Sequence, residues 1–255
     1  MSSYYKPNRK PDWNYGGPRW RLSRSKIDLF VNCPRCFYVD NKLGVARPPG
    51  FPFNLNSAVD HLLKKEFDIH RKERSSHPLM QSYGIEAIPY QHEDIDIWRD
   101  NFKGLEFKHK STGMTISGAL DDVWVNSDDE LIVVDYKATS KDGEITALEE
   151  DWHVGYKRQM EVYQWLLRKM GHNVSSTGYF VYANGQKDRE AFDAKLEFDV
   201  TLIPYTGNDA WLEPTILEIK KTLDMGSAPL QGEDCDYCRY RGAVRELGIE
   251  NDLGG

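Results

Sequence analysis

Apolar residues recur at helical spacing in several stretches of the chain. In the clearest stretch, Trp152, Tyr156 and Tyr163 lie on one stripe, and Gly171 follows where a helix commonly ends. The same spacing, with capping residues before it, recurs near the N-terminus, before the middle of the chain and near the C-terminus. We therefore predict four helices, over residues 23–39, 56–72, 151–170 and 209–223.

Runs rich in β-branched and aromatic residues lie between these helices and predict strands. The runs cover residues 105–108, 114–125, 131–138, 178–183 and 191–204. A polar turn at 126–129 joins the second run to the third, which predicts a hairpin. The order of helices and strands indicates a mixed α/β domain, with a sheet flanked by helices.

The amino-acid composition is that of a folded, globular protein. Hydrophobic residues make up 40% and aromatic residues 12% of the 255 positions, which argues against a disordered chain. No apolar run approaches the roughly 18 residues of a membrane span, and the polar start of the chain predicts no secretory signal. We expect a cytoplasmic location, with a tail over residues 1–22 and one domain over 23–255.

The charge is uneven along the chain. The net charge is −7, yet residues 1–26 carry +6 and the remainder carries −13. The basic segment also contains five aromatic residues: Tyr4, Tyr5, Trp13, Tyr15 and Trp20. Cations interleaved with aromatic rings suit a phosphate backbone with exposed bases. The alternative is a solubilising tail whose aromatic residues pack on the domain.

Candidate chemistry is concentrated in the predicted hairpin. Asp135 and Lys137 are two residues apart on a strand, so they share a face. The partner strand offers Asp121 or Asp122 beside Asp135, and the pattern alone leaves the register open. Adjacent carboxylates repel unless a cation joins them, and hard oxygen ligands favour Mg²⁺ or Mn²⁺. The alternative for such a short pattern is an exposed salt bridge between Asp135 and Lys137.

Several motifs, in order, resemble the PD-(D/E)XK nuclease superfamily and in particular its RecB-like branch. That branch includes the CRISPR-associated RecB-like exonucleases and the AddB nuclease domain. The matching pieces are an opening helix from Ser23 to Tyr38, His61 on the next helix, Gly118-Ala119-Leu120-Asp121, Asp135-Tyr136-Lys137, and Gln159 with Tyr163 on a later helix. The resemblance implies a restriction-endonuclease-like core with a central mixed sheet flanked by helices.

The resemblance also implies the metal ligands of an active site. It selects Asp121 over Asp122, and it implies that His61, Asp121, Asp135 and the backbone carbonyl of Tyr136 hold Mg²⁺ or Mn²⁺. These ions activate water and polarise a scissile phosphate.

Three further residues receive catalytic roles from the resemblance. Lys137 is expected to assist the water and stabilise the transition state. Gln159 is expected to position the attacking water or a phosphate oxygen, and Tyr163 to stack on a base or bind a phosphate. In the alternative, Tyr163 belongs to the apolar stripe of its helix, with Gln159 at its border.

The four cysteines form two C-x-x-C pairs, Cys33/Cys36 and Cys235/Cys238. This spacing predicts a metal site that joins the two ends of the domain. Four thiolates suit Zn²⁺ or an iron–sulfur cluster. Part of the RecB-like branch holds a [4Fe–4S] cluster, usually with its cysteines divided one plus three, whereas the division here is two plus two. On the resemblance, the cluster is favoured over zinc.

Together these observations predict a Mg²⁺- or Mn²⁺-dependent deoxyribonuclease. The resemblance implies a RecB-like exonuclease of DNA repair, recombination or CRISPR-type defence, acting on DNA that is single-stranded or has free ends. The main alternative is a catalytically inactive nucleic-acid-binding module of the same fold. An electron-transfer protein is the third hypothesis, and a cluster buried far from any donor site argues against it.

Overall fold

The computed structural model describes residues 8–48, 50 and 53–248. The chain divides into two compact units, each assembled from segments far apart in sequence. The first, which we call the cysteine unit, comprises Met1–Gly50, His109–Met114 and Trp211–Gly255. The second, the sheet unit, comprises Phe51–Lys108 and Thr115–Ala210.

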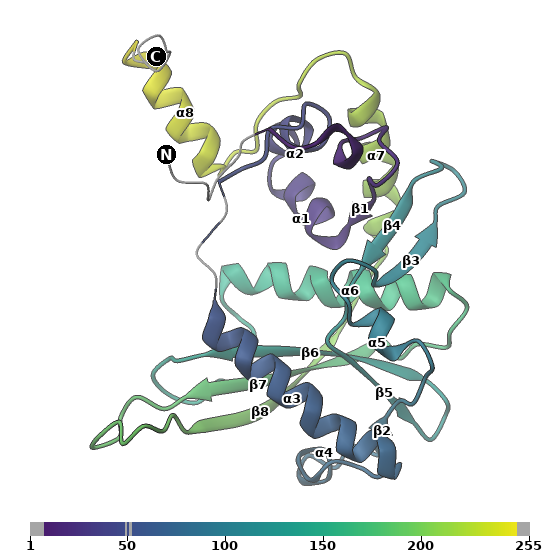
Figure 1. Ribbon diagram of the computed structural model, residues 1–255, viewed down its shortest axis with the longest axis vertical. Helices are drawn as coiled ribbons and strands as arrows, with labels where there is room; N and C mark the ends of the chain where they lie inside the picture. Colours follow the sequence, from purple (N-terminus) through teal and green to yellow (C-terminus); the bar gives the residue numbers. More distant parts are fainter. Residues whose placement is uncertain (1–7, 49, 51–52, 249–255) are drawn as a thin grey trace. The chain divides into compact units, whose positions relative to one another are not determined.

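The sheet unit is built on five strands in the order β2-β5-β6-β7-β8 (Figure 1). Their bounds are β2 (Ala87–Pro89), β5 (Asp122–Asn126), β6 (Leu131–Thr139), β7 (Thr177–Gly185) and β8 (Phe198–Thr206). β6 and β7 are parallel, and the other neighbours are antiparallel. A parallel pair needs a crossover connection. It is supplied by η2 (Asp151–His153) and α6 (Val154–Lys169).

Helices cover both faces of this sheet. The remaining elements of the unit are α3 (Asn54–Glu73), α4 (Pro78–Ser82), α5 (Ile95–Trp98) and the antiparallel pair β3 (Leu105–Lys108) and β4 (Thr115–Gly118). Val134 and Tyr136 of β6 point to one face, where they share a buried core with Phe67 of α3. On the other face, Gly178 of β7 lies against Met160 of α6. The predicted mixed α/β fold with a helix-flanked sheet is confirmed.

The predicted strand over 114–125 is interrupted. β4 ends at Gly118 and β5 begins at Asp122. Between them, the backbone N–H of Leu120 donates to the carbonyl of Trp98 at 3.2 Å, which takes this residue out of any strand ladder. The interruption puts Asp121 at the point where β5 starts.

The cysteine unit is mainly helical. Its elements are η1 (Pro11–Trp13), β1 (Leu22–Ser23), α1 (Arg24–Asn32), α2 (Pro34–Asn41), α7 (Leu212–Asp224) and α8 (Asp236–Glu246). The prediction of one helix over 23–39 is wrong. Cys33 is extended, with φ −161° and ψ 100°, because the ring of Pro34 disfavours the helical conformation of the preceding residue. The break separates α1 from α2 at the first C-x-x-C pair.

The described part of the predicted tail packs against helices of its own unit. Its side-chain contacts include the Arg9–Asp40 ion pair at 2.7 Å, Trp20 Nε1 donating to Asn41 Oδ1 at 3.0 Å, and the Tyr15 hydroxyl donating to Asp224 Oδ1 at 2.9 Å. Residues 1–7 of that tail, with Tyr4 and Tyr5, lie outside the described residues.

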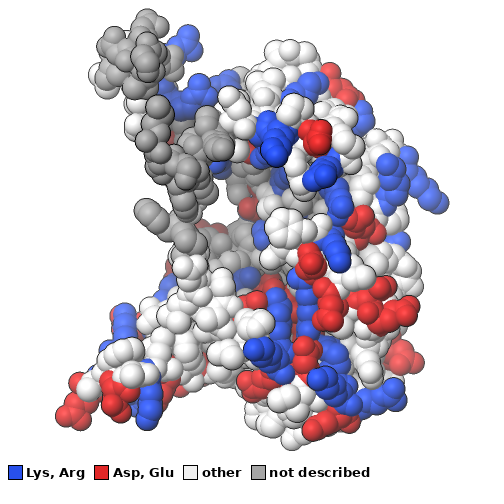
Figure 2. Space-filling model, in the orientation of Figure 1, with Lys and Arg blue, Asp and Glu red and all other residues white. Residues whose placement is uncertain are grey.

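The described surface carries charges of both signs. Figure 2 shows acidic and basic side chains mixed on the projecting connection between β7 and β8. Lys187 of this connection pairs with Asp142 at 3.0 Å, and Arg189 pairs with Glu197 within the connection at 2.7 Å. Across the described residues, the helices are all too short or too polar to traverse a lipid bilayer.

Candidate active site

The register of β5 and β6 decides which aspartate faces Asp135. Asp122 pairs with Val134, so the residue before β5 stands opposite Asp135. That residue is Asp121. Its Oδ2 accepts the backbone N–H of Tyr136 at 2.9 Å, which fixes the carboxylate against the end of β6. Two carboxylates therefore project from neighbouring chain segments at one place in the sheet.

Lys137 is held by groups from β6 and α6. It forms an ion pair with Asp135, whose side chain is 0% exposed. Its Nζ lies 3.4 Å from Gln159 Oε1, to which it donates, and 4.3 Å from the centre of the Tyr156 ring. Gln159 in turn donates from Nε2 to the hydroxyl of Tyr163 at 3.1 Å. A continuous series of side-chain contacts thus links four predicted site residues: Asp135, Lys137, Gln159 and Tyr163.

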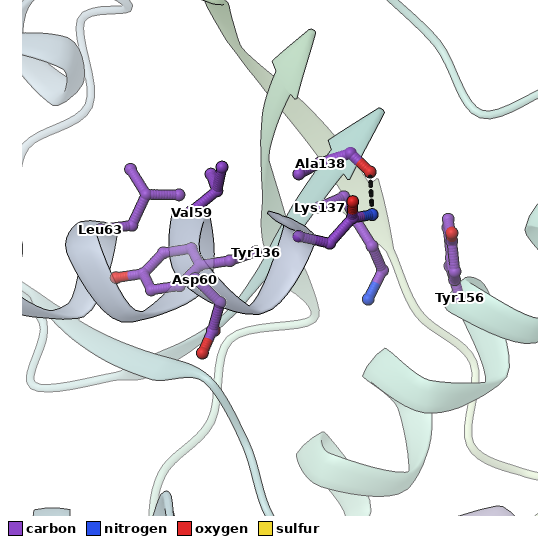
Figure 3. Close-up of a pocket in the computed structure, with 8 residues that line it drawn as sticks. Val59, Asp60, Leu63, Tyr136, Lys137, Ala138 and Tyr156 are labelled. Atoms are coloured by element: carbon purple, nitrogen blue, oxygen red, sulfur yellow. Dashed lines mark hydrogen bonds between the residues drawn. The ribbon is translucent and has the colours of Figure 1, made fainter. Parts of the chain in front are cut away.

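A pocket of about 90 Å³ opens beside Lys137, among residues of α3, β6 and α6. Figure 3 shows Asp60 on one side of Lys137 and Tyr156 on the other. The lining residues are Asn56, Val59, Asp60, Leu63, Tyr136, Lys137, Ala138 and Tyr156. Asn56 Nδ2 donates to the carbonyl of Ala138 at 2.6 Å, which ties the start of α3 to the end of β6.

Lys64 lies between two carboxylates at this site. Its Nζ is 2.9 Å from Asp60 Oδ2 and 3.4 Å from Asp121 Oδ1. Burial opposes the charge of Lys64, but the two carboxylates outweigh burial and raise its pKa. Burial, followed by the charge of Asp121, raises the pKa of Asp60. The two acids are thus already organised around a cation.

Asp122 belongs to a different, buried network. Its Oδ1 accepts from Arg71 and, at 2.8 Å, from Arg99, and its Oδ2 accepts from the Tyr136 hydroxyl at 2.6 Å. Burial first, and the Asp122 carboxylate second, raise the pKa of Tyr136 well above its ordinary value, so this hydroxyl stays protonated and donates. Asp122 is 0% exposed and joins α3 to the sheet rather than facing the pocket.

The structure places the side chain of His61 on the exposed surface of α3, whereas Asp60 lines the pocket. The difference follows from helix geometry, since successive residues are rotated by about 100° and Asp60 shares its face with Leu63 and Phe67. The role of His61 as a ligand stays a prediction, and Asp60 is an additional candidate. Asp60 and Lys64, four residues apart beside an apolar stripe, were the available sequence signal.

The oxygen donors at the site suit a hard divalent cation. Carboxylates of Asp60, Asp121 and Asp135, with the backbone carbonyl of Tyr136, are the ligand types that Mg²⁺ and Mn²⁺ prefer. The ammonium group of Lys64, between two of these acids, marks a position where positive charge is favoured. By donor type these residues suit a divalent ion, but within the described residues only the four cysteines have three or more ligand atoms close enough together to share one ion as they stand.

The four cysteines come together in the cysteine unit. Their sulfur atoms all lie within 4.8 Å of one another, and Cys33 and Cys235 are buried. Burial opposes ionisation of Cys33, but the backbone N–H groups of Gly232 and Cys36 lower its pKa to about 7. Burial, followed by the neighbouring thiol of Cys36, raises the pKa of Cys238. A bound cation would stabilise these sulfurs in their thiolate form.

The sequence model of one family, the PD-(D/E)XK nuclease superfamily, matches residues 54–243. This match covers most of the chain and includes the β5–β6 site. The chain belongs to the PD-(D/E)XK nuclease superfamily. Membership indicates a hydrolase that acts on nucleic acid, and members of the superfamily use divalent metals.

Several solved structures match this chain, and one of them is titled "Crystal structure of SSO0001". The two chains are 15% identical, with a TM-score of 0.41, and the similarity covers 87% of this chain and 84% of the other. Comparison with curated proteins finds no match.

Proposed function

We propose that this PD-(D/E)XK nuclease is a Mg²⁺- or Mn²⁺-dependent deoxyribonuclease of the RecB-like kind. It acts from free ends of single-stranded DNA, in repair, recombination or CRISPR-type defence. The observation that carries the proposal is the position of Asp121, just before β5, opposite Asp135 of β6 and its ion-pair partner Lys137. None of the four cysteines is in a disulfide, which suits the reducing interior of a cell, where we propose the enzyme works.

Asp121, Asp135 and the carbonyl of Tyr136 would hold the ion, with Asp60 or His61 as a further ligand from α3. When bound, the ion supplies Lewis-acid chemistry, which polarises the scissile phosphate and favours deprotonation of water. These oxygens would approach the ion from β6, from the residue before β5 and from α3. Asp121 is itself held by the Tyr136 N–H at 2.9 Å, so its carboxylate needs little reorganisation.

Lys137 is the group that would meet the substrate phosphate. Its ammonium group places a positive charge where little water reaches, since the Lys137 side chain is only 12% exposed. There it would donate to a phosphate oxygen and stabilise the extra negative charge of the transition state. Gln159 accepts from the same ammonium and Tyr163 accepts from Gln159, so both act on substrate through the position of Lys137.

The preference for single strands rests on the basic N-terminal segment. Trp13 is 41% exposed, and the guanidinium carbon of Arg19 lies 5.6 Å from the centre of its ring. An exposed aromatic ring beside a cation suits stacking of an unpaired base together with contact to phosphate.

End-labelled linear and circular single-stranded DNA, each with Mg²⁺ or Mn²⁺, test the activity and its dependence on ends. We expect degradation of the linear strand only. Asp135→Asn and Lys137→Met should each reduce the rate by at least about 100-fold, as expected when transition-state charge loses its partner. Lys187→Met, on the exposed β7–β8 connection, is the matched control and should cleave normally.

Two results would overturn the proposal. The first is cleavage by Lys137→Met at the wild-type rate. The second is DNA binding that survives EDTA with no cleavage by the wild-type protein under any of these metal conditions. The second result would instead support the inactive binding module.

A further inference from the structure

The size of the cysteine cluster restricts what it can hold. Three sulfur–sulfur distances are short: 3.8 Å between Cys33 and Cys238, 3.6 Å between Cys36 and Cys235, and 3.5 Å between Cys36 and Cys238. No pair in the quartet exceeds 4.8 Å. The four sulfurs therefore outline a small tetrahedron.

Two kinds of metal centre require different tetrahedra. A single zinc ion with zinc–sulfur bonds of about 2.3 Å puts its four sulfurs about 3.8 Å apart. In a [4Fe–4S] cluster each thiolate binds a different iron at a corner of the cube, so the cysteine sulfurs stand about 6 Å apart. The observed distances match the single ion and are too short for the cube.

We infer that the quartet binds one tetrahedral metal ion, zinc, rather than a four-iron cluster. This differs from the sequence interpretation, which favoured the cluster. Zinc is chosen over a single ferrous ion because Zn²⁺ binds thiolate sites more tightly in the usual order of divalent metals. The inference does not depend on DNA cleavage, so it can fail or succeed independently of the proposed nuclease activity.

The surroundings compensate the charge of such a site. Four thiolates and one divalent ion carry a net charge of −2. Arg47 donates from Nη2 to Cys235 Sγ at 3.3 Å, and its guanidinium carbon lies 4.4 Å from the centre of the Tyr237 ring. Backbone N–H groups of Gly232 and Cys36 donate to Cys33 Sγ at 3.3 and 3.4 Å.

The two helices that carry the cysteines add to this compensation. Cys33 precedes the first residue of α2, and Cys235 precedes the first residue of α8. Each C-x-x-C pair thus lies at the N-terminal, positive end of a helix, where negative charge is stabilised. Arg47 acts outside the ligand sphere, as a positioning and charge-balancing residue.

Metal analysis of the full-length protein, purified without oxygen, tests the inference directly. We expect one zinc per chain, no acid-labile sulfide and no broad absorption near 400 nm. After chelation, Co²⁺ should produce the visible bands of a tetrahedral thiolate site, saturate at one equivalent and be displaced by one equivalent of Zn²⁺. About four irons and four sulfides per chain would overturn the inference, as would Co²⁺ binding without those bands.

Arg47→Gln tests the charge balance while keeping all four ligands. We expect its zinc affinity, measured by competition with a chromophoric chelator, to fall at least tenfold, in the range of about 10–100-fold typical of outer-shell changes. Arg241→Gln, an exposed arginine on α8, is the matched control and should bind zinc like the wild type. Equal zinc affinity for Arg47→Gln and wild type would overturn the charge-balancing role.

Discussion

Asp121 and Asp122 are adjacent in sequence, yet the structure gives them opposite consequences when each is changed to asparagine. Asp122 is 0% exposed and accepts from two guanidinium groups, Arg71 and Arg99. These side chains are only 7% and 8% exposed. Asparagine keeps the shape but removes the charge, which leaves the two buried guanidinium groups with the more exposed Asp68, 35% exposed, as their acidic partner. Breaking such a pair costs about 3–5 kcal/mol.

Asp121 is less dependent on its charge for folding. Its side chain is 21% exposed, its contact with Lys64 is 3.4 Å long, and an asparagine oxygen can still accept the N–H of Tyr136. We expect Asp121→Asn to cost no more than about 1 kcal/mol of unfolding free energy, as for partly exposed pairs. Cleavage, however, should fall by at least about 100-fold, because Asp121 is a proposed metal ligand.

Thermal unfolding and DNA cleavage, measured on both variants, separate these effects. A loss of 3–5 kcal/mol should lower the melting temperature by about 10 °C in a protein of this size, against about 3 °C or less for Asp121→Asn. Below its own transition, Asp122→Asn should still cleave DNA. Wild-type melting of Asp122→Asn, or unfolding of Asp121→Asn in its place, would contradict these assignments.

Three further predictions concern other positions. Gly118→Ala would bring a Cβ to 2.7 Å from Cε1 of Tyr163, so we expect a loss of about 1–3 kcal/mol on denaturant unfolding; unchanged stability would contradict this packing. Burial lowers the pKa of His153 in the folded protein. As the pH drops below about 6.5, the unfolded chain therefore takes up a proton before the folded protein does, and the unfolding free energy should decrease. That fall should be smaller in His153→Gln, and equal pH slopes would refute it. Trp13→Ala should weaken single-stranded DNA binding about 5–100-fold in a direct binding assay, whereas an unchanged Kd would exclude stacking there.

The sequence predicted the fold where local periodicity and global packing agree. The stripe on α6 and the β5–β6 hairpin were readable because each buries an apolar face. The interruptions at Cys33 and at residues 119–121 were harder to predict from the sequence. Pro34 does disfavour a continuous helix, but helical spacing of apolar residues continues on both sides of it and hides the interruption. The exit of residues 119–121 from the sheet depends on a distant partner, the carbonyl of Trp98.

Part of the candidate site could also be predicted from local periodicity. Strand parity puts Asp135 and Lys137 on one face, and the helix repeat brings Gln159 beside Tyr163. The choice between Asp121 and Asp122 depends on a register that only long-range pairing fixes. The sequence did not identify Asp60 as a site residue, because its place in the pocket depends on how α3 is rotated against the sheet, and tertiary packing sets that rotation.

The cysteine quartet also affects the order in which the protein can mature. Cys36 and Cys235 are 199 residues apart, so one ion bound by both closes most of the polypeptide into a loop. Closing so long a loop removes much of the freedom of the denatured chain. Since synthesis proceeds from the N-terminus, the second pair of thiols leaves the ribosome only after the first pair and the whole sheet unit have been made. Metal capture by all four ligands is therefore a late event in biogenesis, and chains cut short before Cys238 can never complete it.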